Sequence, residues 1–415
     1  MTRRSLLVAF SVAHFAHHVT NSLLSALLPF ISTAFGLSYA SAGFLVSAYS
    51  IASGMTNAPL GILADRVGAR RVIVWGLVLI GLSSVAIGLS SEYWQLLAFL
   101  AVMGIASGTY HAPASALIAE MFSSRRGMAM GTHTTAGHLS FFAAPLVAGI
   151  LATAGTWRTP YIAFAIAPIA CAVLLWRVAP MGTRSTGRHG WLATGGDIAM
   201  VARRVGALVS LSIVFQVVIS AAMAFLSTYL VDARGISPGV AAALFGVPQL
   251  AGLIGAPMAG TLSDRFGRRI VLLLGLALMG PAAWALTVVP NELVFLPLLL
   301  IGISFSIRAT TTEVLIVDNT PADRRSTVLG SYYLVNQPVG GVAATIFGVV
   351  AGAIGMAAAY GWLAVIFLVL SAIALVVAWP TARALRRAPS YRTEPNPPAG
   401  GISRACHSAS RSHSS

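Results

Sequence analysis

The sequence predicts an all-α integral membrane protein whose twelve transmembrane helices form two parallel six-helix repeats. Three observations predict this class. Hydrophobic residues make up 57% of the 415 residues and charged residues only 9%, whereas soluble domains carry about 25% charged residues. Apolar runs of about 20 residues, the length that crosses a bilayer, recur along the whole chain. A charged segment that contains glycine is also written twice, once in each half.

Twelve apolar runs are long enough to span a membrane. They cover roughly 6–31, 40–63, 72–90, 94–118, 128–153, 160–178, 207–230, 238–262, 270–289, 293–317, 327–353 and 356–379. A large soluble helical protein is the alternative, but its helices need polar faces that these runs lack. The first run follows two arginines, as in a signal peptide. Because further spanning runs follow at once, we expect it to remain as the first helix.

The distribution of these runs predicts four regions. We expect an N-terminal six-helix bundle at 1–178, a cytoplasmic linker at 179–206, a C-terminal six-helix bundle at 207–379 and a disordered cytoplasmic tail at 380–415. The linker carries several glycines and arginines, and a surface helix is expected near 197–204. The tail is rich in serine, proline and arginine and poor in apolar residues, which is typical of disorder.

The charged segment shows that the two halves are copies of one design. It runs from Gly61 to Arg70 and recurs from Gly260 to Arg269, which is 199 residues further on. Both copies hold glycine, leucine, aspartate, arginine, glycine and arginine with identical gaps. Each half has six spans, an even number, so both copies enter the membrane from the same side and lie parallel.

The formal net charge of +15 indicates membrane topology and not nucleic-acid binding. All 26 basic residues are arginines. Most of them lie at the N-terminus, in loops after even-numbered helices, in the linker or in the tail, and only Arg158 and Arg234 fall on the other side. Because arginine-rich loops stay in the cytoplasm, we expect both termini on the cytoplasmic side of a bacterial inner membrane.

Twelve spans in two copies, each with G-x-L-x-D-R-x-G-x-R between its second and third helix, resemble the major facilitator superfamily. The resemblance covers roughly 5–380. His14, Asn21 and Pro29 in the first helix, with the stretch GIASGTYH at 104–111 in the fourth, resemble the fosmidomycin-resistance branch of its efflux permeases. The resemblance implies the major facilitator fold and alternating access to a site between the halves, without a cofactor.

The duplicated segment, with two further acidic residues, predicts a cytoplasmic gate. A carboxylate at the end of the second or eighth helix can accept backbone N–H groups at the start of a neighbouring helix, which the resemblance places in the opposite half. The arginines need partners, so we expect Arg66 and Arg70 to cluster with Glu120, and Arg265 and Arg269 with Asp318. The alternative is that these charges only anchor loops. The predicted gate residues are Gly61, Asp65, Arg66, Gly68, Arg70, Glu120, Gly260, Asp264, Arg265, Gly267, Arg269 and Asp318.

Polar residues within the spans predict the substrate or proton pathway, because ionisable groups at bilayer depth are costly and usually face a cavity. Arg308 suits an anionic group on the substrate, and Glu313, about 140° further round the helix, is expected beside the same cavity. A polar stripe on the first helix is expected to line the pathway, and one of its histidines can carry a coupled proton. The predicted pathway residues are His14, His18, Asn21, His111, His138, Arg308, Glu313 and Gln337.

These residues also have structural alternatives. Arg308 and Glu313 can form a neutralised contact between helices, and any single histidine can be a hydrogen-bonded core residue, although the cluster as a whole favours function. Several histidines can bind a transition metal. Since no acidic or cysteine ligand accompanies them at metal spacing, we expect no metal site and no cofactor.

The predicted function is secondary active transport. Proton-coupled export of a small drug-like or anionic organic compound is preferred over proton-coupled uptake of an organic anion or metabolite. A membrane enzyme needs a nucleophile–base pair or a metal constellation, and the sequence shows neither. A non-transporting receptor would have no use for charges inside the membrane. We expect a monomer whose partners are the bilayer, the substrate and protons, and not nucleic acid.

Overall fold

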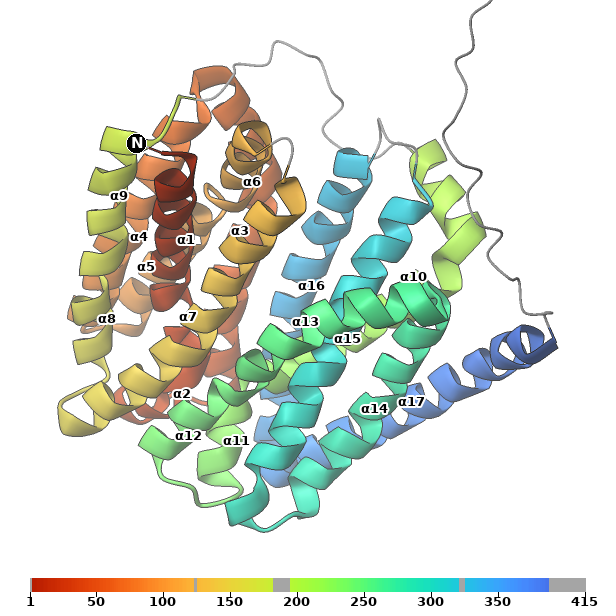
Figure 1. Cartoon of the computed structure of the whole chain (residues 1–415). Coiled ribbons are helices and arrows are strands. Elements are labelled where there is room, and N and C mark those ends of the chain that lie inside the picture. Colours follow the sequence, from red (N-terminus) through yellow and green to blue (C-terminus); the bar gives the residue numbers. More distant parts are fainter. Residues whose placement is uncertain (1, 123–124, 182–194, 321–324, 388–415) are drawn as a thin grey trace, which may run out of the picture.

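The computed structural model describes residues 2–122, 125–181, 195–320 and 325–387. These residues form helices and connecting loops only, which confirms the all-α class (Figure 1). Ten stretches of the described residues are long and apolar enough to cross a membrane. The helices are α1 (Arg3–Asn21), α2 (Leu23–Phe35), α3 (Tyr39–Val67), α4 (Ala69–Leu89), α5 (Tyr93–Ser107), α6 (His111–Met121), α7 (Arg126–Ala154), α8 (Arg158–Phe164), α9 (Ile166–Val178), α10 (Gly195–Ala224), α11 (Leu226–Asp232), α12 (Pro238–Phe245), α13 (Val247–Phe266), α14 (Arg268–Val288), η1 (Asn291–Leu293), α15 (Phe295–Asp318), α16 (Arg325–Ile354) and α17 (Met356–Arg387).

The two predicted spans outside these ten contain buried polar side chains. The first span consists of α1 and α2, which are separated at Ser22, and the second is α3. Thr20 in α1 and Ser47 and Ser53 in α3 are buried. Because these side chains are enclosed by the protein and do not meet lipid, a lower mean hydropathy is compatible with a position among the other spans.

Two boundaries differ from the sequence expectation. The predicted surface helix near 197–204 is the first part of α10, which continues unbroken from Gly195 into the seventh span. Val201 and Val205 belong to the hydrophobic core, so this part is packed and is not a separate surface element. At the other end, α17 continues to Arg387, so the start of the predicted disordered tail is helical. Residues 388–415 lie outside the described residues.

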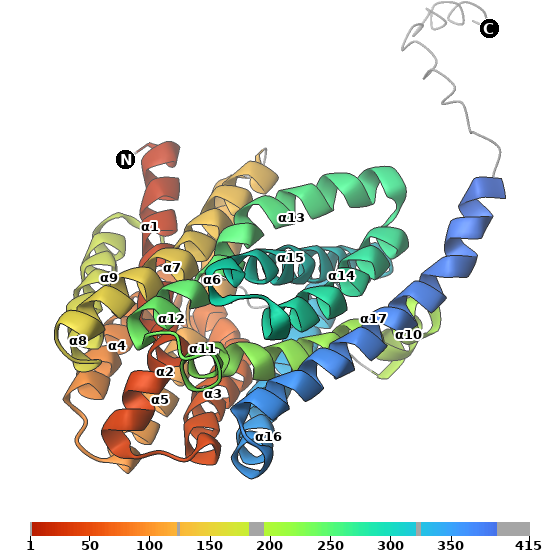
Figure 2. The same cartoon turned by 90° about the horizontal axis from the view of Figure 1, so that it is seen from below.

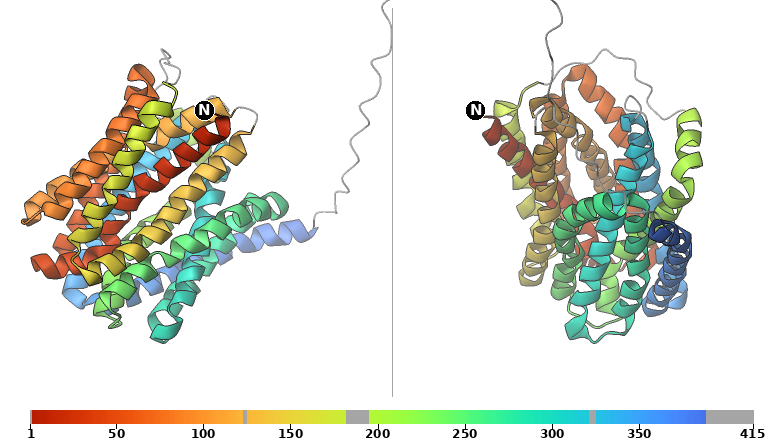
Figure 3. Two further views of the ribbon diagram at one scale, coloured as in Figure 1. Left: turned by 60° about the vertical axis from the view of Figure 1, so that its left-hand side comes forward. Right: turned by 45° about the vertical axis from the view of Figure 1, so that its right-hand side comes forward.

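The helices form two groups that follow the order of the chain. The N-terminal group is α1–α9 and the C-terminal group is α10–α17 (Figure 1). The groups meet along α3 and α16, along α7 with α12 and α13, and where α2 contacts α11 and α12. Figure 2 shows α11 and α12 beside α2 and α7 at this boundary. Figure 3 shows α13, α14 and α17 extending away from the N-terminal group.

The contacts between the groups follow an antiparallel register. Along α3 and α16 the contacting pairs are Tyr39 with Gly348, Gly43 with Ala344 and Gly54 with Pro338; along α7 and α12 they include Gly149 with Gly239 and Phe142 with Gly246. A Cβ at Gly43 would lie 2.6 Å from the Ala344 carbonyl oxygen, so the close approach requires glycine. Gly149 and Gly348 match in the sequence repeat and both lie at these interfaces. The two interfaces are therefore structural copies.

The groups are bonded to each other at the end of the molecule where α3 begins. The Tyr39 hydroxyl donates to Asp232 Oδ2 at 2.8 Å across the boundary. Arg158, at the start of α8, caps this same end by donating to the Ser90 carbonyl at 2.7 Å. At the opposite end of α3, Asp65 is exposed and forms no ion pair among the described residues.

Candidate transport pathway

A cavity of about 290 Å³ lies between the two helix groups. Small-molecule sites usually enclose about 300–1,000 Å³, so the cavity has the size for a small organic compound. Both groups contribute to its wall, which combines neutral polar and aromatic side chains. The lining residues are Ser25, Val46, Ser50 and Phe141 from the N-terminal group, and Gln216, Ile219, Ser220, Met223, Ala224, Phe245, Pro248, Gln249, Ile301, Phe305, Gln337, Gly340 and Gly341 from the C-terminal group.

Arg308 lies directly behind the wall of this central cavity. Its side chain is 2% exposed, and its guanidinium donates to Ser212 Oγ at 3.2 Å and to Gln216 Oε1. It also lies over the Phe305 ring, 5.1 Å from the ring centroid. Since Gln216 and Phe305 both line the cavity, Arg308 acts on the cavity through them.

The charge of Arg308 is compensated by neutral groups. Among the described residues no carboxylate forms an ion pair with Arg308, and its Nε atom has no hydrogen-bond partner. Glu313, the predicted neighbour, bonds to the Tyr333 side chain. Glu313 attracts Arg308 electrostatically but makes no ion pair with it. A guanidinium at bilayer depth without a carboxylate in contact is costly, so an anion in the cavity would lower the free energy of this arrangement.

A chain of hydrogen bonds leads from Arg308 to the cavity surface. Gln216 accepts from Arg308 through Oε1 and donates through Nε2 to Ser220 Oγ at 2.9 Å. The Ser220 oxygen thus accepts, which leaves its hydroxyl hydrogen available to a ligand. The positive charge at the start polarises each member of the chain. This wall therefore favours a ligand that carries negative charge or hydrogen-bond acceptors.

Histidines from three helices gather inside the N-terminal group. We define this histidine cluster as His14, His17 and His18 of α1, His111 of α6 and His133 of α7. The rings of His14 and His133 stack with their centroids 4.1 Å apart. The centroids of the other three rings lie between 4.8 and 6.4 Å from that of His14.

Interruptions in two spans position this cluster. The fourth span leaves the helical path between Ser107, where α5 ends, and His111, where α6 begins. The Ser107 carbonyl accepts from His17 Nε2 at 3.2 Å, and the Ser107 hydroxyl accepts from Asn21 Nδ2 at 3.2 Å. Non-helical backbone inside a membrane is typical of places where a cavity or an ion is bound.

The hydrogen bonds fix the protons on two of these rings. His14 Nδ1 lies 2.8 Å from the His133 carbonyl oxygen, which can only accept, so Nδ1 carries the hydrogen. His14 Nε2 therefore holds a lone pair, and it lies 3.1 Å from His18 Nε2. His18 Nε2 donates in this arrangement, which leaves His18 Nδ1 as a buried acceptor without a partner. The pair thus offers basic nitrogen atoms to a cation.

The predicted histidine stripe does not line the central cavity, which corrects the sequence expectation. His14 and His17 are 6% and 0% exposed, and α1 packs on α7 and α9 inside the N-terminal group. Some of the histidine ring nitrogens are hydrogen-bonded there, and others, including His18 Nδ1, have no partner. Two contacts still join the cluster to the cavity wall. The His18 ring lies 4.5 Å from that of Phe141, and His138 bonds to the Gln249 side chain.

Among the eight predicted pathway residues, Gln337 lines the central cavity directly. Arg308, His18 and His138 touch lining residues, as described above. Asn21 and His111 lie at the two helix interruptions, and Glu313 lies beyond Arg308 on α15. The sequence reasoning did not single out Ser220 or Phe141. Serine and phenylalanine are common in membrane helices, so their types alone carried no signal.

Two of the four glycines in the duplicated segments have a conformational role. Gly68 and Gly267 have φ values of 99° and 89°, a region that favours glycine, so the turns after α3 and α13 need this residue. A Cβ at Gly61 would lie 3.6 Å from the Ala112 side chain, whereas nothing lies within 4 Å of one at Gly260. A Cβ would therefore fit at both positions, so neither Gly61 nor Gly260 permits an especially close helix approach in this conformation.

In the first copy of the segment, the structure gives Arg70 contacts other than the predicted one with Glu120. Arg70 donates to the Ala179 carbonyl at 3.1 Å and lies over the Trp176 ring, so it holds the end of α9. Arg66, like Asp65, is exposed at the end of α3. The aromatic ring and carbonyl of α9 are closer partners for Arg70 because α4 packs along α9.

In the second copy, Arg268 forms the ion pair with Asp318 that the sequence assigned to its neighbours, and a second ion pair with Asp264. Its guanidinium lies 2.5 Å from Asp264 Oδ1 and 3.2 Å from Asp318 Oδ2. Of the predicted partners of Asp318, Arg265 lies over the Phe266 ring and Arg269 donates to the Arg204 carbonyl. Arg268 is the first residue of α14, directly after the turn, so it is the arginine nearest to the ends of both α13 and α15.

Arg268 escaped the sequence reasoning because the repeat does not contain it twice. The position that matches Arg268 in the first half is Ala69, and the position that matches Asp318 is Ala119. Both members of this ion pair are therefore present in one half and absent from the other. A comparison that considers only residues repeated in both halves therefore overlooks Arg268 and Asp318.

We expect Arg268→Gln to shift the molecule toward closure at the end that holds the duplicated segments. The substitution releases Asp264, which can then reach the start of α7 in the opposite group. Exposed ion pairs are worth about 0–1 kcal/mol, so a roughly twofold to fivefold population shift is expected. Spin labels at Met128 and Phe266, two exposed residues of α7 and α13, measure the distance. An identical shift in Arg269→Gln, or none in Arg268→Gln, would contradict this role.

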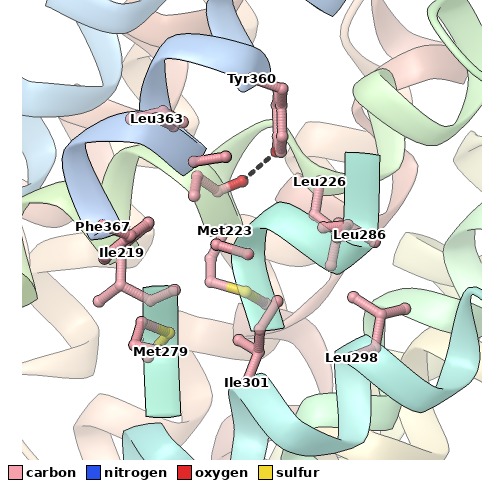
Figure 4. Close-up of a pocket in the computed structure, with 13 residues that line it drawn as sticks. Ile219, Met223, Leu226, Met279, Leu286, Leu298, Ile301, Tyr360, Leu363 and Phe367 are labelled. Carbon is pink, nitrogen blue, oxygen red and sulfur yellow. Dashed lines mark hydrogen bonds between the residues drawn. The ribbon is translucent and has the colours of Figure 1, made fainter. Parts of the chain in front are cut away.

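A second, smaller cavity lies within the C-terminal group. It measures about 20 Å³ and is lined almost entirely by apolar side chains, including Met279, Leu298 and Phe367 (Figure 4). Ile219 and Met223 line both cavities and so separate them. An apolar lining offers an ordered water too few hydrogen-bond partners. It is packing space beneath the wall of the central cavity.

Comparison with known proteins is consistent with this arrangement. Residues 10–345 and 208–409 match the family model described as Major Facilitator Superfamily. A multidrug resistance protein, MdtG of Yersinia enterocolitica, is 27% identical over 322 residues, which is 74% of each chain. A probable 4-methylmuconolactone transporter of Cupriavidus pinatubonensis is 25% identical over 356 residues, which is 82% of each chain.

Solved structures resemble this fold over almost its whole length. One is a bacterial homologue of the human lysosomal transporter Spinster, in an inward-facing and unoccupied conformation. The two structures have a TM-score of 0.73 and 18% sequence identity, and the match covers 94% of this chain and 99% of the other. At this identity the likeness concerns the fold.

Proposed function

Because this chain belongs to the major facilitator superfamily, whose members matched here are membrane transporters and not enzymes, we propose that it exports a small drug-like or anionic organic compound in exchange for protons. The observation that carries this proposal is the central cavity of about 290 Å³ with Arg308 behind its wall. The two helix groups serve as the two six-span bundles and rock about this cavity in alternating access.

The chemistry of the cavity wall supports an anionic substrate. The chain from Arg308 through Gln216 to Ser220 presents a polarised donor, and Phe141, Phe245 and Phe305 supply apolar surface for an organic skeleton. The similarity to a multidrug resistance protein favours export. The similarity to a probable 4-methylmuconolactone transporter favours the alternative, uptake of an organic anion or metabolite. Both use the same cavity and differ in the direction of the gradients.

The histidine cluster is the proposed proton site. Imidazole changes its charge near neutral pH, and the lone pair of His14 with the unpartnered Nδ1 of His18 provides acceptors. The contacts of His18 with Phe141 and of His138 with Gln249 connect this site to the substrate cavity. Protonation at the cluster and substrate in the cavity can therefore influence each other through one layer of side chains.

The remaining proposals concern the membrane. The arginine distribution supports insertion into a bacterial inner membrane with both termini and the duplicated segments on the cytoplasmic side. The Tyr39–Asp232 contact then lies at the outer face and joins the two groups there. A monomer suffices, because both halves of the site belong to one chain.

Flux measurements on the purified protein in liposomes test the proposed function. An imposed proton gradient is expected to drive accumulation of anionic organic compounds, with little or no driven flux of cationic compounds of similar size. His14→Gln is expected to abolish gradient-driven accumulation while exchange of substrate across the membrane at equal pH continues, because the cavity wall is intact. The variant His407→Gln, at a histidine far from the spans in sequence, serves as the control. Gradient-driven flux in His14→Gln equal to wild type would refute the proton role.

A further inference from the structure

We propose that His14, His18 and His111 form a binding site for a divalent transition-metal ion, with Zn²⁺ as its best-suited occupant. One nitrogen atom from each of the three residues lies within 4.8 Å of the other two. His14 and His18 are spaced i, i+4 on α1, so both side chains stand on one face of the helix. The third ligand comes from the start of α6, across the interruption of the fourth span.

The distances suit a tetrahedral ion. Zinc binds imidazole nitrogen at about 2.0–2.1 Å, which separates two ligand atoms of a tetrahedron by about 3.3 Å. His14 Nε2 and His18 Nε2 lie 3.1 Å apart. When both bind the ion, the hydrogen on His18 Nε2 moves to His18 Nδ1, which has no hydrogen-bond partner in the ion-free arrangement. His111 keeps access to solvent, so small side-chain rotations can bring its nitrogen to the same centre. Three histidines with an open fourth position match the ligand set of open zinc sites.

The surroundings prepare His14 as a metal ligand. Metal-binding histidines usually donate their second ring N–H to a carbonyl or carboxylate, which fixes the tautomer and the ring orientation. His14 Nδ1 donates to the His133 carbonyl at 2.8 Å, so its Nε2 points its lone pair at His18. The His133 ring stacks on the other side of His14 and holds its plane.

The charge balance selects the class of ion and the fourth ligand. Neutral imidazoles suit zinc, copper and nickel better than magnesium or calcium, which prefer oxygen. Helices α1 and α7 contain no carboxylate, and Glu120 of α6 lies nine residues beyond His111, about 13.5 Å along the helix. The three neutral ligands therefore leave the charge of the ion uncompensated. Water, hydroxide or a small anion would take the fourth position. The sequence reasoning excluded a metal because it required an acidic or cysteine ligand, and it could not see that folding brings His111 to the pair on α1.

Calorimetric titration of the full-length protein, purified without a histidine tag, with Zn²⁺ tests this site. We expect one tightly bound ion per chain. His14→Gln, His18→Gln and His111→Gln should each weaken binding by at least about tenfold. A double variant, His407→Gln with His413→Gln, removes tail histidines and should bind as wild type does. Absence of Zn²⁺ binding to wild type, or loss of binding in the tail variant alone, would overturn the proposal.

Two further measurements distinguish the loss of a metal ligand from misfolding of a variant. Co²⁺ in place of Zn²⁺ should give the visible absorption of a tetrahedral site in wild type and not in the three variants. Saturating Zn²⁺ should raise the thermal midpoint of wild type, since an ion that binds only the folded state stabilises it, and should leave that of His18→Gln unchanged. Equal cobalt spectra in wild type and all three variants would refute the assignment.

The proposed metal site and the proposed proton-coupling role can be refuted independently of each other. Bound Zn²⁺ occupies the lone pairs that would accept a proton, so it should suppress gradient-driven flux in wild type if the histidine cluster carries the proton. The binding measurements need no gradient and no organic substrate. Zinc that binds without changing flux would contradict the proton role and leave the metal site intact.

Discussion

Replacing Arg308 by Gln is expected to raise the KM for an anionic substrate by about tenfold to a hundredfold, since hydrogen bonds to charged groups contribute about 1.5–3 kcal/mol. The guanidinium is the positive charge that polarises Gln216 and Ser220 at the cavity wall. Without it the wall retains its shape and its neutral donors, so uncharged compounds should be affected far less. Initial-rate measurements in liposomes with a matched pair of anionic and neutral compounds give this ratio.

The same substitution should leave the protein folded. The guanidinium is buried and donates hydrogen bonds to the neutral Ser212 and Gln216 side chains, with Glu313 attracting it without an ion-pair contact. Removal of its charge therefore also removes a desolvation cost. We therefore expect the thermal midpoint of Arg308→Gln to equal or exceed that of wild type. Arg177→Gln, at an exposed arginine of α9, is the control for loss of one positive charge. An unchanged KM for the anion, or an equal loss for anionic and neutral compounds, would refute the anion-binding role.

Asp65→Asn is expected to slow transport by roughly fivefold to thirtyfold without preventing substrate binding. The antiparallel register that pairs Tyr39 with Gly348 and Gly54 with Pro338, continued to the end of α3, places Asp65 opposite the start of α16. The first N–H groups of a helix are unpaired and attract a carboxylate. Such a cap contributes about 1–2 kcal/mol, and it forms only when the gate ends of the two groups come together.

By the sequence repeat, we expect Asp264 to cap the start of α7 as Asp65 caps the start of α16. Register contacts between Gly149 and Gly239 and between Phe142 and Gly246, continued in the same way, place Asp264 opposite the start of α7. In the present conformation Asp264 is held by Arg268 within its own group. Asp65→Asn should therefore favour the separated arrangement of the gate ends, whereas Arg268→Gln should favour the closed one. Opposite shifts in the gate distance, each caused by removal of one charge at the same end of the molecule, are difficult to explain by a general loss of stability.

Spin labels at Met128 and Phe266, in a background with Cys171 and Cys406 replaced by serine, report the gate distance in both variants. Glu292→Gln removes an exposed acidic residue at the other end of the molecule and should change neither the distance nor the flux. Wild-type flux in Asp65→Asn, or an unchanged distance distribution, would show that this carboxylate only anchors its loop.

The sequence determined those properties of this protein that depend on local composition and on repetition. Spans appear as apolar runs because a bilayer requires about 20 such residues in succession, and the duplicated segment identified both the fold and the turn glycines Gly68 and Gly267. Arg308 was visible because a charge within a span is rare, and the structure gives it partners at the cavity wall.

Only the tertiary structure decided which polar groups meet. The histidine side chains of α1 face the interior of the N-terminal group, because the helix breaks at Ser22 and after Ser107 supply hydrogen-bonding partners there. The ion pairs went to Arg268, which stands nearest to Asp264 and Asp318 at the end of α14. Periodicity states which residues share a face of one helix. The rotation of that helix among its neighbours depends on contacts between distant residues, and these are not written in any local pattern.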